Sequence, residues 1–253
     1  MRRSLSHLPR RALLVAMAVG AALITVSSLA YFDFHTLPPF AVEKLPVRFE
    51  RLWLASLRVH VASALVALPL CIVLMTRTLQ RRHAAHRWLG RVAGTLILFA
   101  LVPSGIVLAF DAKGGKPVTA GFLLSAGIVA WATVRGVAAA RTRDLVVHRR
   151  AMRHVFAQLS VAVTSRALIL AFDAAGIDPD VAYVVALWGP VIASAAVVEI
   201  VSLSPALHVW MERIRREIFP LALFVRARPI TAPLAGRGGR LTPAGRAGAG
   251  PSR

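Results

Sequence analysis

Six long apolar stretches constrain this chain more than any other feature of its sequence. They cover about residues 12–30, 53–75, 88–110, 119–139, 150–172 and 181–203. A helix that crosses the roughly 30 Å hydrocarbon core of a bilayer needs about 20 mostly apolar residues, and each stretch approaches or exceeds that length. A water-soluble fold would require a polar face on these segments, which they lack. The sequence therefore predicts an all-α fold, a polytopic transmembrane helical bundle of about six helices.

The placement of the basic residues explains a net charge of +20. If the chain crosses the membrane six times, the arginines near residues 2–11, 77–87, 141–153 and beyond 213 share one side. Short loops rich in arginine and lysine stay in the cytoplasm. We therefore predict a multi-pass protein of the inner (plasma) membrane with both termini cytoplasmic. Because topology accounts for the charge, membrane lipids are the expected partners and nucleic acid is not.

Two stretches of the chain repeat each other in register. His86-Arg87, Arg91 and the sequence LAFDA at 108–112 correspond to His148-Arg149, Arg153 and LAFDA at 170–174. Internal repeats indicate architecture. We predict two parallel helical-hairpin repeats, at about 53–114 and 115–176, related by an axis along the membrane normal. Together they would form a central four-helix bundle, with the first and sixth helices outside it.

The rest of the chain divides by composition. Residues 1–30 are typical of a signal anchor or first transmembrane helix, and a cleaved signal peptide is the alternative. The other predicted parts are an external loop at 31–52, a helical membrane domain at 53–204 whose last helix is 181–203, a basic amphipathic segment at 205–225 and a disordered tail at 226–253. The single cysteine, Cys71, excludes a disulfide framework within the chain.

Ionisable side chains inside a bilayer are candidates for function, because burying them is costly. At about 1.5 Å of rise per residue, His60 and Arg166 lie at a similar depth below the external surface. His154 and Glu199 lie together near the inner surface by the same reasoning. We predict that these four residues contribute to a buried polar site in the bundle.

His86 and His148 occupy equivalent positions of the two repeats, so they should lie at one depth and could face each other. Such a pair suits one axial haem b, with Arg91 and Arg153 neutralising the cofactor's carboxylates. Electron transfer with a membrane quinone or another membrane protein would follow. Two alternatives remain open for the His-Arg pairs. One is interfacial anchoring of the helices, and the other is binding of lipid phosphate or another anion.

No catalytic residue can be named from the sequence. It contains no Walker loop, no Gly-x-Ser-x-Gly, no His-Glu-x-x-His and no dinucleotide fingerprint. Whether the chain is an enzyme is left open. A non-enzymatic membrane protein, either a transporter subunit or a structural partner, is the alternative to an electron carrier.

Several of these motifs also carry a family resemblance. His60, the His86-Arg87-x-x-Gly90-Arg91 motif and the motif that runs from Arg143-Asp144 through His148-Arg149 to Met152-Arg153 resemble domain of unknown function 2306 (DUF2306), over about residues 50–175. The resemblance implies a multi-pass inner-membrane protein and no established activity. A more distant similarity is to transmembrane b-type cytochromes, which are four-helix electron carriers with paired histidines. The chain departs from their two-haem pattern, because no histidine lies opposite His60.

Overall fold

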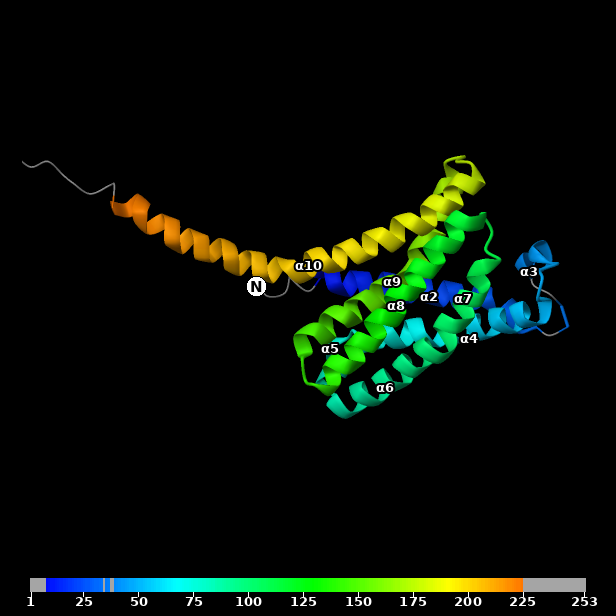
Figure 1. Ribbon diagram of the computed structural model, residues 1–253, viewed down its shortest axis with the longest axis horizontal. Helices are drawn as coiled ribbons and strands as arrows, with labels where there is room; N and C mark the ends of the chain where they lie inside the picture. The colour runs from blue at the N-terminus through cyan, green and yellow to red at the C-terminus, as the bar shows by residue number, and fades with distance from the viewer. Residues whose placement is uncertain (1–7, 34, 37–38, 225–253) are drawn as a thin grey trace, which may run out of the picture. The chain divides into compact units, whose positions relative to one another are not determined.

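The computed structural model describes residues 8–33, 35–36 and 39–224, which contain helices and no strand. The long helices are α2 (Leu8–Ser28), α4 (Glu50–Leu74), α6 (His83–Leu96), α7 (Val102–Phe110), α8 (Gly115–Arg141), α9 (Leu145–Ala174) and α10 (Pro179–Phe224) (Figure 1). Shorter elements are a 3₁₀ turn η1 (Leu29–Phe32), α3 (Pro39–Lys44), α5 (Arg77–Arg81) and a π-helical turn η2 (Ile97–Leu101) that joins α6 to α7.

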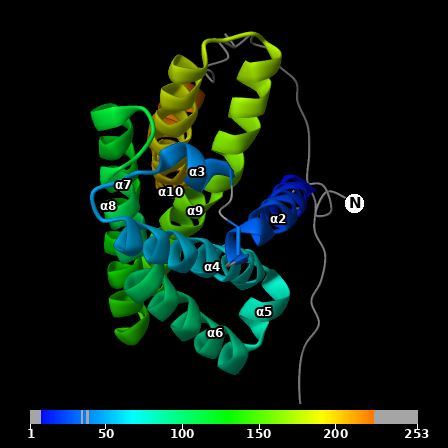
Figure 2. The same cartoon turned by 90° about the vertical axis from the view of Figure 1, so that its right-hand side faces the viewer.

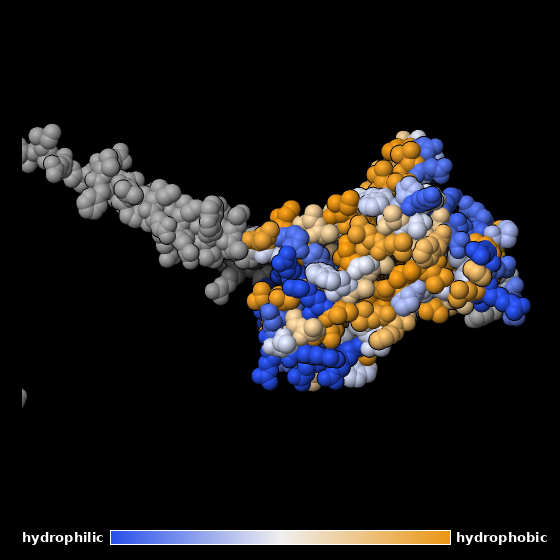
Figure 3. All heavy atoms as spheres, viewed as in Figure 1, coloured by the Kyte–Doolittle hydropathy of each residue, from blue (hydrophilic) through white to orange (hydrophobic). Residues whose placement is uncertain are grey.

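Six helices of the described chain are long and apolar enough to cross a membrane, as the sequence predicts. Their bounds are Ala12–Phe32, Glu50–Leu74, His83–Phe110, Gly115–Arg141, Leu145–Ala174 and Pro179–Leu203. On the face shown in Figure 3, hydrophobic residues cover the middle of the helices and hydrophilic residues gather toward their ends. This distribution suits a bilayer, because apolar side chains are favoured in the hydrocarbon core and polar ones at its two surfaces.

The second to fifth crossings form the core. One cluster of buried residues joins Ala67 and Cys71 of α4 with Ile97 and Leu101 of η2, and it continues through Val129 and Ala132 of α8 to Val155 of α9. Around this cluster α4 packs against α6–α7, α7 against α8, α8 against α9, and α9 against α4 (Figure 2). The segment α6–α7 and helix α9 therefore lie across the bundle from each other. The common origin of the two hairpins stays a prediction.

The first and sixth crossings lie outside the four-helix core. Met17 and Ala21 of α2 pack against Leu68 and Ile72 of α4, with Val163 of α9 partly buried beside them. Leu187 and Val191 of α10 pack against Val118 of α8 and Val161 of α9. Each peripheral helix thus covers one seam of the bundle.

The helix α10 continues without a break from its membrane span to Phe224. The part of α10 from Ala206 to Phe224 belongs to a unit separate from the rest of the described chain. The predicted segment 205–225 is therefore helical as far as Phe224, while the predicted tail at 226–253 lies outside the described residues.

Short polar turns join the helices, and their residue types fit their geometry. The Asp144 carboxylate accepts hydrogen bonds from the backbone N–H groups of Val146 and Val147, which caps the start of α9. Gly114, before α8, has φ +90°, and Gly176, before α10, has φ +69°. A side chain at either position would be strained in this left-handed region.

The predicted external loop folds over one end of the bundle. It contains α3, whose Ala41 is buried against Trp53 and Leu57 of α4. An ion pair of 2.7 Å between Lys113 Nζ and Glu43 Oε1 ties α3 to the turn before α8. This hydrogen bond lowers the pKa of the Glu43 carboxyl and raises the pKa of the Lys113 ammonium.

The two shifts set the pH range over which the ion pair stabilises the fold. The lowered pKa of Glu43 gives stability that is present above its ordinary value of 4.5 and is lost as the pH falls through the folded value. The raised pKa of Lys113 gives stability that is present below its ordinary value of 10.5 and is lost as the pH rises through the folded value. The ion pair therefore makes its full contribution to stability between pH 4.5 and pH 10.5.

Replacing Lys113 by glutamine should raise the pKa of Glu43 toward its ordinary value, because the ammonium that donates to the carboxylate is removed. NMR titration of the Glu43 side-chain carboxyl carbon measures this change. Lys116→Gln is the matched control, since Lys116 is exposed at the start of α8, three residues further on, and forms no ion pair within the described chain. An unchanged Glu43 titration in Lys113→Gln would contradict the ion pair.

Candidate functional site

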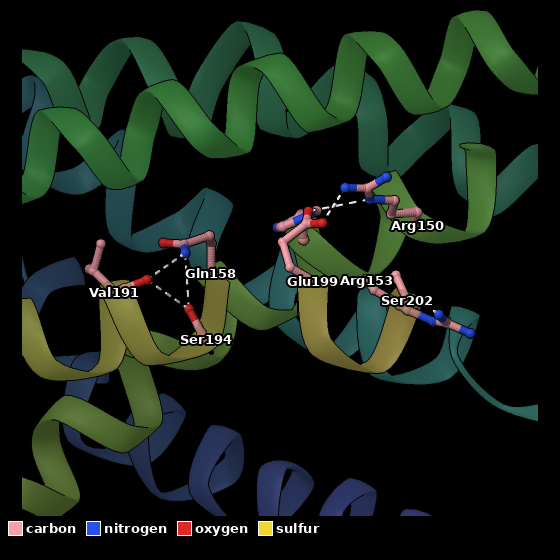
Figure 4. Close-up of polar contacts among 8 residues, drawn as sticks. Arg150, Arg153, Gln158, Val191, Ser194, Glu199 and Ser202 are labelled. Carbon is pink, nitrogen blue, oxygen red and sulfur yellow. Dashed lines mark hydrogen bonds and ion pairs between the residues drawn. The ribbon is translucent and has the colours of Figure 1, made fainter. Parts of the chain in front are cut away.

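A histidine, a glutamate and an arginine meet between α9 and α10, near the basic end of the bundle. The Nε2 of His154 lies 2.7 Å from Oε1 of Glu199. Arg150, one turn earlier on α9, donates to both carboxylate oxygens, from Nε to Oε1 at 3.3 Å and from Nη2 to Oε2. Figure 4 shows Arg150 reaching across to Glu199. The structure therefore joins His154 and Glu199, two residues that the sequence places at one depth.

His154 is the buried member of this cluster. Its side chain is only 7% exposed, whereas that of Glu199 is 38% exposed and that of Arg150 is 52% exposed. The ring of Trp131 on α8 meets the imidazole edge-on, with 6.4 Å between ring centroids, and the guanidinium of Arg135 lies over the Trp131 ring. The other ring nitrogen, Nδ1, is buried and has no hydrogen-bond partner in the described chain.

A second polar junction, centred on Gln158, lies about one turn deeper along α9. The Gln158 Nε2 donates to the carbonyl of Val191 at 3.0 Å and to Ser194 Oγ at 2.9 Å, both on α10 (Figure 4). Its Oε1 accepts a hydrogen bond of 2.9 Å from Ser125 Oγ of α8. The buried amide thus connects three helices, and both of its ends are satisfied.

His60 binds an irregular turn of the neighbouring helix. Pro103 has no N–H, which removes a backbone hydrogen bond one turn earlier, and the chain forms the π-helical turn η2 at that place. The Nδ1 of His60 lies 3.2 Å from the carbonyl oxygen of Leu101, and Ser104 Oγ donates to the same carbonyl at 3.1 Å. The histidine therefore helps to satisfy a carbonyl at the irregular turn.

Arg166, the other half of the predicted outer pair, has a different partner. Its Nη1 donates to the carbonyl of Ala162, one turn back on its own helix, at 2.9 Å. No hydrogen bond joins it to His60 within the described part of the chain. The structure therefore divides the four predicted polar residues into one bonded pair, His154 with Glu199, and two residues with separate partners.

His86 and His148 both lie at the basic end of the bundle, on α6 and α9. The Nδ1 of His148 lies 2.8 Å from the carbonyl oxygen of Gly136 on α8. His86 is half-buried, and its Nδ1 is buried without a hydrogen-bond partner in the described residues. The structure therefore places both histidines at one end of the bundle, on segments that lie across it from each other.

The arginines predicted to accompany these histidines lie elsewhere. Arg153 is exposed, and its Nη1 lies 3.5 Å from Ser202 Oγ on α10. Arg91 is also exposed and lines an open hollow along the first turns of α6. Within the described residues, neither forms a hydrogen bond with a histidine, and their pairing with cofactor carboxylates stays a prediction.

Sequence reasoning missed Gln158 and Arg150. The cost of burying a charge singles out ionisable groups within apolar stretches, and an amide is not one of them. The available signal was the amide itself, since Gln158 interrupts an otherwise apolar run between Val155 and Leu159. Arg150 belongs to the basic stretch at 141–153 that membrane topology explains, yet it completes the Glu199 cluster.

The chemistry open to these groups is that of imidazole and carboxylate. His154 with Glu199 can carry a proton, and His86 with His148 can offer ring nitrogens to a metal. Within the described residues, no three His, Cys, Asp or Glu side chains converge on a metal position. Two imidazoles suffice when a porphyrin supplies the other four ligands of an iron.

Comparison with known proteins places the chain within one family. The family model described as "Predicted membrane protein (DUF2306)" matches residues 57–202. The match therefore extends past the stretch that carries the motif resemblance and includes the membrane span of α10 with Glu199. No curated protein and no solved structure matches the chain.

Proposed function

The chain belongs to the DUF2306 family of predicted membrane proteins, and from its own side chains we propose that it holds one haem b between His86 and His148 for transmembrane electron transfer. The family description names a location and no reaction. The proposal therefore rests on what these two residues offer at the basic end of the four-helix core.

The observation that carries the proposal is the hydrogen bond from His148 to Gly136. A backbone carbonyl only accepts, so the Nδ1 that lies 2.8 Å from it carries the proton. In the neutral imidazole, Nε2 then keeps its lone pair. Histidines that bind metals usually donate their second ring N–H in this way, which fixes both tautomer and orientation. His148 is therefore prepared to act as a ligand through Nε2.

His86 would supply the second imidazole of the site. Its Nδ1 is buried with no hydrogen-bond partner in the described chain, and an unpaired buried polar atom costs free energy. The segment α6–α7 and helix α9 lie across the bundle from each other, the usual relation of residues that share a cofactor in a helical bundle. His148, like His86, is half-buried.

The bound haem would supply an iron that gains and loses one electron, with a potential set by its axial ligands and burial. The chain's own residues would hold the iron through two imidazoles and fix one of them through Gly136. Arg91 and Arg153 are not part of the proposed site, because Arg153 lies within reach of Ser202 and Arg91 lines an exposed hollow.

A second candidate is a non-enzymatic membrane protein in which the His-Arg pairs only anchor helices. The observation that favours it is Arg149, whose Nε donates to the carbonyl of Leu145 on its own helix at 2.9 Å. An arginine folded back on its helix at the membrane edge is typical of an interfacial anchor. In this case the polar contacts between α9 and α10 would be structural.

An absorption spectrum separates the two candidates. Detergent-purified full-length protein, expressed with added haem precursor, should show a Soret band and a change in the visible bands after addition of dithionite. His86→Ala and His148→Ala should each lose most of the bound haem, because each removes one of the two imidazoles that would hold the iron. His83→Ala is the matched control, since His83 is exposed on the same helix, and it should keep the spectrum.

Protein that shows no Soret band under these conditions would exclude the haem and favour the anchoring function. Haem binding that survives both His86→Ala and His148→Ala would show that a haem is bound at some other place. Equal loss in His83→Ala would indicate damage to the first turn of α6 rather than loss of a ligand.

A further inference from the structure

Equivalent arginines of the two His-Arg motifs have different surroundings. On α9, Arg149 donates to the carbonyl of Leu145 and Arg153 lies within reach of Ser202 Oγ. On α6, the corresponding Arg87 and Arg91 are exposed, and neither forms a hydrogen bond or ion pair within the described residues. The α6 arginines therefore keep all their donors available for a ligand outside the protein.

These two arginines border one open hollow. It lies along the first turns of α6 and is lined by Ala84, Ala85, Arg87, Trp88, Leu89 and Arg91. Arg87 and Arg91 are four residues apart, so their side chains lie on one helix face as neighbours. The small side chains of Ala84 and Ala85 leave room, while the ring of Trp88 is 63% exposed. The hollow thus combines two guanidinium groups with an apolar surface.

The position of the hollow along the helix indicates the kind of ligand that it binds. It lies in the first turns of the span His83–Phe110, where the lipid headgroups meet the helix. Exposed tryptophan is enriched at this level of a membrane. A guanidinium presents several N–H donors in a plane and can bind two oxygens of one phosphate. We propose that Arg87 and Arg91, with Trp88, bind the phosphate head of an anionic phospholipid.

A lipid fits better than a soluble phosphate compound. Trp88 at the hollow, and Val92 and Phe99 further along the same segment, have exposed side chains. They offer an apolar surface for acyl chains. A soluble anion would leave this surface unused. The site would thus be one headgroup between two arginines, with its chains lying along α6 toward η2. This inference does not depend on haem binding.

The test uses native mass spectrometry of the full-length protein in detergent. The delipidated protein is titrated with phosphatidylglycerol and, separately, with zwitterionic phosphatidylcholine. We expect preferential retention of phosphatidylglycerol. The double variant Arg87→Gln/Arg91→Gln should weaken phosphatidylglycerol binding by about tenfold or more, as expected for two basic contacts at an anionic surface.

The matched control is Arg149→Gln/Arg153→Gln, which removes the same charge from the equivalent positions of α9. It should change binding by less than about twofold. Equal weakening in the two double variants would overturn the site and indicate attraction by total charge. Equal retention of both lipids, or displacement of phosphatidylglycerol by millimolar inorganic phosphate, would also overturn the assignment to an anionic lipid.

A third variant, Arg87→Lys/Arg91→Lys, separates charge from geometry. It keeps both positive charges and removes the planar guanidinium groups. If the arginines bind one phosphate together, this variant should lose several-fold in affinity. Full wild-type affinity would contradict a specific headgroup site. Because both side chains are exposed and lack partners in the described chain, the variants should fold normally.

Discussion

Replacing Glu199 by leucine should lower the free energy of unfolding by about 2–3 kcal/mol. The larger part comes from His154, whose side chain is 7% exposed. The substitution removes the acceptor of its Nε2, and its Nδ1 already has no partner in the described chain. The ring would then have two unsatisfied nitrogens in a buried site. The contact with Arg150 contributes less, because both of its partners are partly exposed.

Unfolding of the full-length protein in mixed micelles, followed by circular dichroism, measures this loss. Ser202→Ala is the matched control on the same helix, because it removes only the 3.5 Å contact with Arg153, and it should stay within about 0.5 kcal/mol of the wild type. Glu199→Gln keeps an acceptor oxygen and should fall between the two. If Glu199→Leu and Ser202→Ala have the same stability, the His154–Glu199 bond does not support the fold.

A double variant gives an independent check on the cause. His154→Leu/Glu199→Leu removes both partners, so no buried polar atom of the pair is left unsatisfied. Its loss of stability should therefore be smaller than the sum of the two single losses. Additive losses would mean that the two side chains act on the fold separately.

The six crossings could be predicted because the bilayer leaves little choice. A stretch of apolar residues in lipid must form a helix to satisfy its backbone, so composition alone gives both the type and the approximate bounds of each element. Apart from α10, which continues to Phe224, the helices extend up to about five residues beyond the apolar stretches, as α9 does from Leu145. The start of α9 is set by the Asp144 cap, which the hydrophobic pattern does not contain.

The contact between His154 and Glu199 agrees with the depth expected from the sequence, but the rotation of each helix could not be predicted. His154 and Glu199 meet, whereas His60 and Arg166, which are expected at one depth by the same reasoning, have other partners. Rotation depends on side-chain packing between helices. At Gly136, a Cβ would lie 2.2 Å from Cε of Met152, so the missing side chain permits the close approach of α8 and α9. That approach brings His148 to the Gly136 carbonyl.

The partner of His60 depends on a local irregularity of the backbone. The π-helical turn η2 follows from Pro103, and the carbonyl that His60 meets lies at the end of that turn. The sequence contains the proline, and a kink is expected from it. The direction in which the affected carbonyls point is decided by the neighbouring helix α4, which a one-dimensional pattern does not describe.

Replacing Gln158 by leucine should cost about 2 kcal/mol of stability, because three hydrogen bonds between helices are lost inside the membrane. Each such bond contributes about 0.6 kcal/mol on average and up to about 1.7 kcal/mol. Leucine is close to glutamine in size, so packing changes little. The same unfolding titration measures the loss. Ser165→Ala is the control, since its hydroxyl bonds only to Val161 of its own helix, and it should have little effect.

Serine variants can separate the hydrogen bond that joins Gln158 to α8 from those that join it to α10. Ser125→Ala removes the hydrogen bond from α8, and Ser194→Ala removes one of the two acceptors on α10. Each should cost about 0.6 kcal/mol in the wild type, and each should cost nearly nothing once Gln158 is leucine, because the amide that they bind is gone. If Ser125→Ala costs as much in the Gln158→Leu protein as in the wild type, the hydroxyl stabilises α8 alone. The contact between α8, α9 and α10 would then depend on apolar packing around Val118, Val161 and Val191, and the amide would be tolerated in the bundle rather than required by it.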